Sequence, residues 1–232
     1  MFEYTYETRY GDYKDFDTIK TSAILDMVQD IATKHSDFCG YGMHKLKEMG
    51  KAWLMQGIKL HLESPVKTLE PITIRTAVKD MKGVVSDRGC IIMQEEKIVA
   101  KTVASWFMVD TDKMRPIRIP SEISEPYGTH DFEDDFFSYK KPELQNLSPL
   151  YTITVSNKEI DTNRHLNNQK SAELLMDALP FDFRFSDMNV YYKKAAYLGD
   201  KLGVCVTDIE NGYYVHLQNE DGETCVAGIF EI

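Results

Sequence analysis

Hydrophobic and polar positions in the first 110 residues change from a helical period to a strand-like one. Between residues 17 and 35 apolar residues recur every three or four positions, which is the spacing of an amphipathic helix. A run at 4–10 and four later runs rich in β-branched and aromatic residues predict strands; the later runs are 53–62, 72–78, 84–93 and 98–110. One helix followed by a series of strands indicates an antiparallel sheet with a helix packed on it.

This pattern lapses over residues 111–150 and then repeats. Prolines recur through the lapse, together with the acidic run Glu133-Asp134-Asp135, and both are typical of a linker. A strand at 151–155, a helix at 169–179 stopped by Pro180, and strands at 188–193, 201–209, 212–218 and 224–230 follow. We therefore predict an N-terminal unit at 1–110, a linker at 111–150 and a C-terminal unit at 151–232.

The repeat is also visible in the residues themselves. Residues 21–27, TSAILDM, align with residues 170–176, KSAELLM, and residues 104–109, ASWFMV, align with residues 227–232, AGIFEI. Because both matches occur in the same order, they indicate one supersecondary unit used twice. The expected fold class is α+β, with two antiparallel sheets that each carry a long helix.

Composition narrows the class of protein. With 232 residues, 43% of them hydrophobic, the chain can bury a sizeable core, and its net charge of −10 argues against nucleic-acid binding. The chain has no apolar run long enough to span a membrane, and its first residues lack the features of a signal peptide, so we expect a cytoplasmic protein. The four cysteines and six histidines show no metal-ligand spacing, which predicts reduced thiols and no metal site.

The densest group of polar side chains is the segment DTNRHLNN at residues 161–168. If the segment is extended, alternation places Asp161, Asn163 and His165 on one side. Asn167 or Asn168 is suited to cap the following helix, whose first N–H groups would favour a developing oxyanion. This pattern predicts activation of water beside a polarised carbonyl, and ordinary turn and cap chemistry is the alternative.

The motif D-x-N-x-H-x-N-N, set in the second of two repeated units, resembles the acyl-acyl carrier protein (ACP) thioesterases, including the plant fatty acyl-ACP enzymes. The resemblance covers essentially the whole chain and implies a tandem hot-dog fold, with an acyl tunnel in the first unit. It implies hydrolysis of fatty acyl-ACP to free fatty acid and carrier, without a cofactor. The implied partner is an acyl carrier protein with a phosphopantetheine-linked chain, and monomer and homodimer both stay open.

The resemblance also implies roles for the motif. His165 would activate water or hydrogen-bond the thioester carbonyl, Asn163 would hold the water or the carbonyl oxygen, and Asp161 would orient its neighbours. Asn167 and Asn168 would support them at the helix start. Water, not a covalent nucleophile, is the expected attacking group.

One departure from the family pattern concerns the general base. The family carries a glutamate after a Tyr-x-Lys-like stretch, and the matching position here is Ala195; the neighbouring cysteine position is Ala196. A cysteine nucleophile is therefore excluded at that position, and either Glu173 or His165 backed by Asp161 would replace the glutamate. The alternatives are an acyl-CoA thioesterase, a non-catalytic acyl-binding protein and, more remotely, a hydratase of the same fold.

Overall fold

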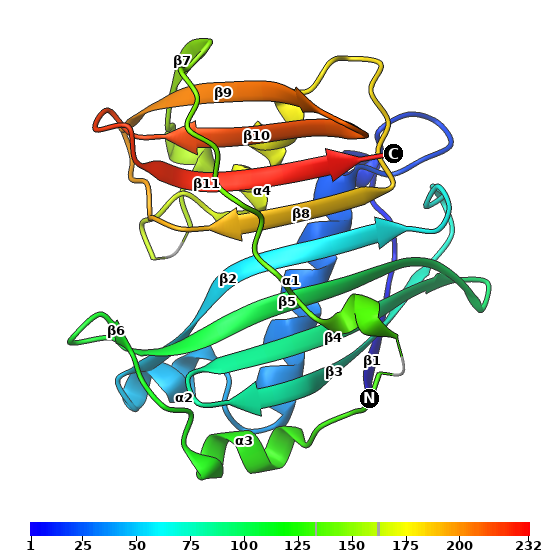
Figure 1. The fold of residues 1–232 in the computed structure, drawn as a ribbon. Coiled ribbons are helices and arrows are strands. Elements are labelled where there is room, and N and C mark those ends of the chain that lie inside the picture. The colour runs from blue at the N-terminus through cyan, green and yellow to red at the C-terminus, as the bar shows by residue number, and fades with distance from the viewer. Residues whose placement is uncertain (133, 162) are drawn as a thin grey trace. The chain divides into compact units, whose positions relative to one another are not determined.

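The computed structural model describes residues 1–132, 134–161 and 163–232 (Figure 1). The chain forms two compact units: unit 1 comprises Met1–Gln56 and Leu60–Tyr139, and unit 2 comprises Gly57–Lys59 and Lys140–Ile232. Glu133 of the acidic run and Thr162 of the polar motif lie outside the described residues. Both units combine an antiparallel sheet with helices, which confirms the predicted α+β class.

Unit 1 contains a sheet of order β1-β3-β4-β5-β2. Its strands are β1 (Phe2–Tyr6), β2 (Lys51–Leu62), β3 (Ile72–Lys82), β4 (Val85–Gln94) and β5 (Lys97–Asp110), with the short β6 (Arg115–Pro116) paired to β5. The neighbours β1/β3, β3/β4 and β4/β5 are antiparallel, and tight turns join β3 to β4 and β4 to β5. The strand-like runs of the first half of the sequence therefore form one sheet.

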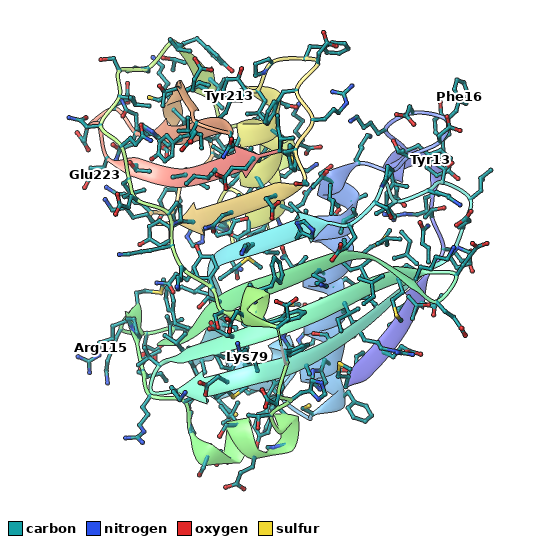
Figure 2. The ribbon with its side chains drawn as sticks, turned by 45° about the vertical axis from the view of Figure 1, so that its right-hand side comes forward. Tyr13, Phe16, Lys79, Arg115, Tyr213 and Glu223 are labelled. Carbon is teal, nitrogen blue, oxygen red and sulfur yellow. The ribbon has the colours of Figure 1, made fainter. Side chains whose placement is uncertain are left out.

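Helix α1 (Thr21–Phe38) crosses one face of this sheet (Figure 1). Its apolar stripe is buried, and Ile31 has no exposed surface. The helix begins four residues later than predicted, because Asp15 Oδ1 accepts the N–H groups of Asp17 and Thr18 at 3.0 and 2.7 Å and folds this segment into a turn. On the same loop Phe16 points away from unit 1 and is 97% exposed (Figure 2).

Residues after Asp110 add to the core of unit 1. They form α3 (Ser121–Tyr127) and the 3₁₀ turn η2 (Asp135–Phe137), in addition to the earlier α2 (Met43–Glu48) and η1 (Tyr10–Asp12). Ile123 and Tyr127 of α3 are buried in a cluster with Leu46, Val78 and Met108. Much of the segment predicted as a linker is therefore folded onto the sheet.

Unit 2 repeats the arrangement with a shorter helix. Its sheet has the order β8-β11-β10-β9-β7, and every neighbouring pair is antiparallel. The elements are β7 (Tyr151–Thr154), η3 (Asn157–Glu159), α4 (Asn168–Asp177), β8 (Asp187–Tyr192), β9 (Lys201–Ile209), β10 (Gly212–Gln218) and β11 (Thr224–Glu231). α4 packs on β10 and β11. A Cβ atom added at Gly228 would meet Leu175 Cδ1 at 3.1 Å, so this glycine lets the helix approach the sheet closely.

The repeated sequence segments occupy matching elements in the two units. Residues 21–27 lie on α1 and residues 170–176 lie on α4. Within them Ser22 and Ala23 are buried, as are Ser171 and Ala172. No helix among the described residues is long and apolar enough to cross a membrane.

Candidate active site

The polar motif of unit 2 forms a closed turn between η3 and α4. Asp161 N–H donates to the carbonyl of His165 at 2.9 Å, and Arg164 N–H donates to the carbonyl of Asp161 at 3.0 Å. Arg164 has a φ of 64°, and the turn is flanked by an antiparallel bridge between Ile160 and Leu166. The segment is therefore not extended, and strand alternation does not set the directions of its side chains.

The carboxylate of Asp161 organises this turn. Its Oδ1 accepts the backbone N–H groups of Asn163 at 2.8 Å and of His165 at 3.1 Å. Its Oδ2 makes a longer contact of 3.5 Å with Asn163 Nδ2. Asp161 thus fixes the backbone that carries the other two predicted site residues, and the structure brings all three together in one short loop.

The side chains of this loop differ in exposure. Asn163 is exposed, whereas His165 is half-buried and packs against the ring of Tyr197, with ring centroids 5.0 Å apart and an interplanar angle of 73°. Within the described part of the chain, neither ring nitrogen of His165 has a hydrogen-bond partner. The imidazole therefore has no bond to another described residue that it would have to lose before it hydrogen-bonds water or a substrate carbonyl.

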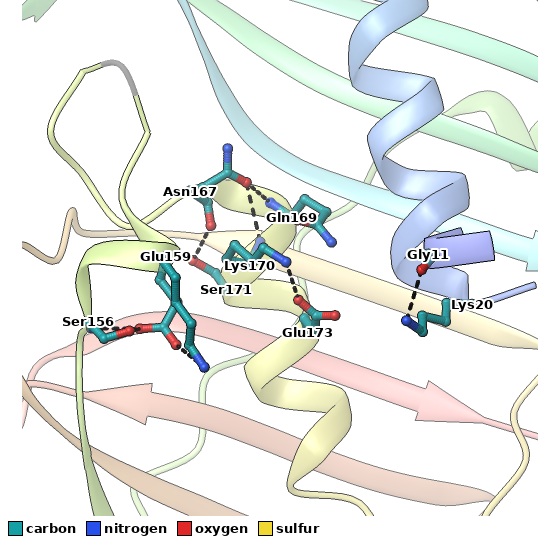
Figure 3. A network of polar contacts seen from close by, with 10 residues as sticks. Gly11, Lys20, Ser156, Glu159, Asn167, Gln169, Lys170, Ser171 and Glu173 are labelled. Carbon is teal, nitrogen blue, oxygen red and sulfur yellow. Dashed lines mark hydrogen bonds and ion pairs between the residues drawn. The ribbon is translucent and has the colours of Figure 1, made fainter. Parts of the chain in front are cut away.

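The N-terminus of α4 is capped by Asn167, as the sequence predicts (Figure 3). Asn167 Oδ1 accepts the N–H groups of Gln169 at 2.8 Å and Lys170 at 3.3 Å. Asn168 is the first residue of the helix, and its carbonyl accepts the hydroxyl of Tyr192 at 3.0 Å. The cap therefore already uses two of the N–H groups that were expected to serve an oxyanion.

Carboxylates on the surrounding elements are engaged. Glu173 on α4 forms an ion pair with Lys170 at 2.7 Å (Figure 3). Glu159 accepts the N–H and the hydroxyl of Ser156 at 2.6 and 2.9 Å, and Asp200 accepts a backbone N–H three residues before it at 2.8 Å. Each of these bonds uses one carboxylate oxygen and holds its side chain in the present position, so a group that replaces the missing glutamate as a general base would act through its second oxygen or after moving.

The segment that should carry this glutamate lies beside the loop. Ala196 is buried and its carbonyl accepts the N–H of Leu166 at 2.8 Å. Ala195 is exposed between β8 and β9, and carries no polar group. Residues 195–197 thus adjoin the residue that follows His165, and Tyr197 supplies the side chain that reaches the imidazole.

Sequence reasoning missed a buried arginine in unit 1. Arg88 on β4 is 6% exposed, and its Nη1 lies 2.7 Å from Nδ1 of His35 and 3.3 Å from Oγ1 of Thr76. Its guanidinium also stands 5.7 Å from the ring centre of Tyr127. Burial, together with the charge of Arg88, lowers the pKa of His35 to about 4, so this histidine is a neutral acceptor at neutral pH.

The alternation of residues along β4 carries a sequence signal that Arg88 is buried. Arg88, Cys90 and Ile92 alternate along β4, so they share one face of the strand. Cys90 and Ile92 are also buried. An arginine in register with buried apolar residues is a candidate for a buried charge, and its histidine partner on α1 cannot be read from spacing along the chain.

A cavity of about 430 Å³ lies in unit 1 and contains none of the predicted site residues. It is lined by Met81, Gly83, Arg118, Ile119, Pro120, Ser121 and Ser124, at the β3–β4 turn and the start of α3. The chemistry predicted from the sequence therefore does not coincide with this cavity.

Solved structures with the same fold cover almost the whole chain. An acyl-ACP thioesterase from Bacteroides thetaiotaomicron matches with a TM-score of 0.89 and 18% identity over 99% of this chain and 96% of that one. The 12:0-ACP thioesterase from Umbellularia californica matches with 0.86 and 14%, over 99% and 96%. A putative oleoyl thioesterase from Lactobacillus plantarum matches with 0.85 and 17%, over 99% and 94%. The fold is therefore a double hot-dog, the class of fold that these thioesterases share.

Family models assign the chain more narrowly. The acyl-ACP thioesterase N-terminal domain matches residues 1–127, and the acyl-ACP thioesterase C-terminal domain matches residues 143–229. This protein belongs to the acyl-ACP thioesterase family. No curated protein sequence matches it.

Proposed function

We propose that this protein hydrolyses fatty acyl-ACP thioesters to free fatty acid and carrier, and so terminates fatty acid synthesis. The observation that carries the proposal is the loop in which Asp161 binds the backbone N–H groups of Asn163 and His165. This bonding holds the exposed amide of Asn163 and the half-buried imidazole of His165 in the same short loop. Membership of the acyl-ACP thioesterase family supports the same reaction class.

The proposed chemistry uses water as the nucleophile. His165 accepts a proton from water while the water oxygen attacks the thioester carbonyl carbon. Asn163 Nδ2 donates a hydrogen bond to the oxyanion that forms on the carbonyl oxygen. When the C–S bond breaks, the leaving thiolate of the phosphopantetheine takes the proton from His165, which restores the neutral imidazole and releases the fatty acid.

Direct attack by water fits the cysteines of unit 2 better than a covalent acyl-enzyme does. The position next to Ala195 is Ala196, which has no nucleophile. Cys225, whose carbonyl accepts the N–H of Lys193, is 3% exposed, and burial raises the pKa of its thiol. A thiol that is buried and protonated is a poor nucleophile.

Two other functions share most of these features. An acyl-CoA thioesterase would use the same loop and differ in the leaving group. A non-catalytic acyl-binding protein is favoured by one observation, which is that Ala195 stands where the family carries its glutamate.

The discriminating experiment is thiol release from one acyl chain presented on holo-ACP and on CoA, repeated over a series of chain lengths. We expect a higher kcat/KM for the carrier-linked chain. A higher kcat/KM for acyl-CoA would contradict the carrier assignment. Retention of acyl chains without thiol release from either substrate would establish the binding protein instead.

A further inference from the structure

We propose that Tyr197 is a positioning residue that sets the orientation of the His165 imidazole. The inference deepens the proposed function and rests on it, because it concerns the group that would activate water. It starts from the contact between the two rings, whose centroids are 5.0 Å apart with planes inclined by 73°. Edge-to-face contacts of this kind are favourable and directional.

The backbone around Tyr197 is fixed relative to the His165 loop. Leu166 N–H donates to the carbonyl of Ala196 at 2.8 Å, so the residues after His165 and before Tyr197 are bonded directly. Tyr197 N–H donates to Asp200 Oδ2 at 2.8 Å, and Asp200 N–H donates back to the carbonyl of Tyr197 at 3.1 Å. The backbone of Tyr197 is therefore part of a closed turn, from which the ring reaches the imidazole.

The turn that carries Tyr197 is also bonded to the end of β7. Gly199 has a φ of 87°, in the left-handed region, and its N–H donates to the carbonyl of Val155 at 2.9 Å. Val155 N–H donates to the carbonyl of Asp200 at the same distance. These reciprocal bonds tie the backbone of the Tyr197 turn to the sheet of unit 2, in addition to its bond with the His165 loop.

Asp161 and Tyr197 restrain different parts of His165. The Asp161 carboxylate accepts the backbone N–H of His165, and the backbone N–H of Asp161 donates to the carbonyl of His165. These two bonds fix the backbone position of the histidine. The imidazole itself has rotational freedom about its side-chain torsions, which a backbone bond does not remove. Tyr197 packs against the ring and limits this freedom, at a site where residue 195 offers no carboxylate to hold the imidazole.

Partial exposure makes Tyr197 suitable for substitution. The residue is 51% exposed, so removal of its ring opens no cavity in the core of unit 2. The observed contact is between the two rings. Tyr197→Phe should therefore preserve the positioning, whereas Tyr197→Leu should remove it while retaining apolar bulk.

The test combines kinetics with NMR of the His165 ring, whose resonance is assigned by its loss in His165→Ala. Tyr197→Leu should lower kcat by about tenfold with KM nearly unchanged, because misplaced groups lose rate rather than binding. It should also move the His165 ring proton shift, since the ring current of Tyr197 is gone. Tyr197→Phe should leave both within error of the original protein.

Tyr213→Leu is the matched control. Tyr213 on β10 makes a similar edge contact with Phe183, with centroids 4.8 Å apart, and lies outside the loop and its neighbouring turn (Figure 2). It should change neither kcat nor the His165 resonance.

The outcomes separate this inference from the proposed function. If the unmodified protein releases no thiol, the proposed function fails. If it is active and Tyr197→Leu keeps its full kcat, the positioning role alone is overturned. Equal loss in Tyr197→Phe and Tyr197→Leu would also overturn it, because the hydroxyl would then be the required group.

Discussion

Asp161 Oδ1 accepts the backbone N–H of His165 at 3.1 Å, across a loop that the same carboxylate also closes through Asn163. These bonds require an acceptor oxygen at this position and do not themselves require a negative charge. The family resemblance implies that Asp161 orients its neighbours, and an acceptor oxygen is sufficient for that role. The two N–H bonds should therefore survive a substitution that keeps the oxygen.

Asp161→Asn should retain most of the activity, and Asp161→Ala should not. Asparagine keeps a carbonyl oxygen that can accept both N–H groups, whereas alanine leaves them unbonded. We expect kcat/KM within about threefold of the original protein for Asp161→Asn and a loss of about 10- to 100-fold for Asp161→Ala. Equal losses in the two variants would show that the charge of Asp161 is required.

Asn167→Ala should destabilise unit 2 by removing the cap of α4. Its side chain accepts two N–H groups of the first turn, and loss of such a cap costs about 1 kcal/mol in the free energy of unfolding. Urea unfolding measures this change. Asn167→Ser, which can still cap, should recover most of it.

Asn168→Ala is the control for this prediction, because the bond of Asn168 to Tyr192 uses its carbonyl, not its side chain. If Asn168→Ala destabilises the protein as much as Asn167→Ala does, the cap is not the cause.

His35 should make stability depend on pH. Its pKa is lowered from 6.5 to about 4 in the folded protein by burial and by the charge of Arg88. Between these values the unfolded chain binds a proton that the folded protein does not, so the free energy of unfolding falls as the pH is lowered from about 6.5 to 4. The loss amounts to at most about 3 kcal/mol and is complete below about pH 4, and His35 adds no pH dependence above about pH 6.5.

The measurement for His35 is the slope of unfolding free energy against pH. His35→Gln retains an acceptor for Arg88 but does not titrate, so its slope should be smaller than that of the original protein. His44→Gln, at an exposed position on α2, is the control and should keep the full slope. An unchanged slope in His35→Gln would assign the effect to other groups.

Ala195→Glu should raise the rate of hydrolysis. Residue 195 is exposed and precedes the residue whose carbonyl binds Leu166, so a carboxylate there lies beside the His165 loop. A positioned base contributes about 100-fold in favourable cases, and we expect a gain of about tenfold in kcat. Ala195→Gln, which matches the length without the charge, should give no gain. No gain in Ala195→Glu would mean that the chemistry of this protein does not use position 195.

Local pattern predicted the sheets well. The predicted strands at 201–209 and 212–218 coincide with β9 and β10, where strand-like runs flank the turn at Asn211. Helix α3 was missed, because it has only seven residues, includes Pro126, and buries Ile123 and Tyr127 against residues far away in the sequence. A short helix stabilised by such tertiary contacts leaves little periodic signal.

The site residues were predicted as a group, but their arrangement was not. The motif letters placed Asp161, Asn163 and His165 together, and the structure has them in one loop. The shape of the loop depends on hydrogen bonds that the Asp161 side chain accepts from backbone N–H groups two and four residues later, and such local bonds compete with an extended strand. Tyr197 could not be identified from the motif, because its proximity to His165 arises from the fold of unit 2.

Single-turnover thiol release from acyl-ACP is the measurement that shows whether His165 and Asn163 carry thioester hydrolysis. His165→Ala and Asn163→Ala should each reduce the rate by at least about 100-fold, since one lacks the base and the other the oxyanion donor. Their thermal unfolding should stay close to that of the original protein, and bound acyl-ACP should still be detected. Release at the original rate in either variant would mean that the substituted residue does not take part in the hydrolysis.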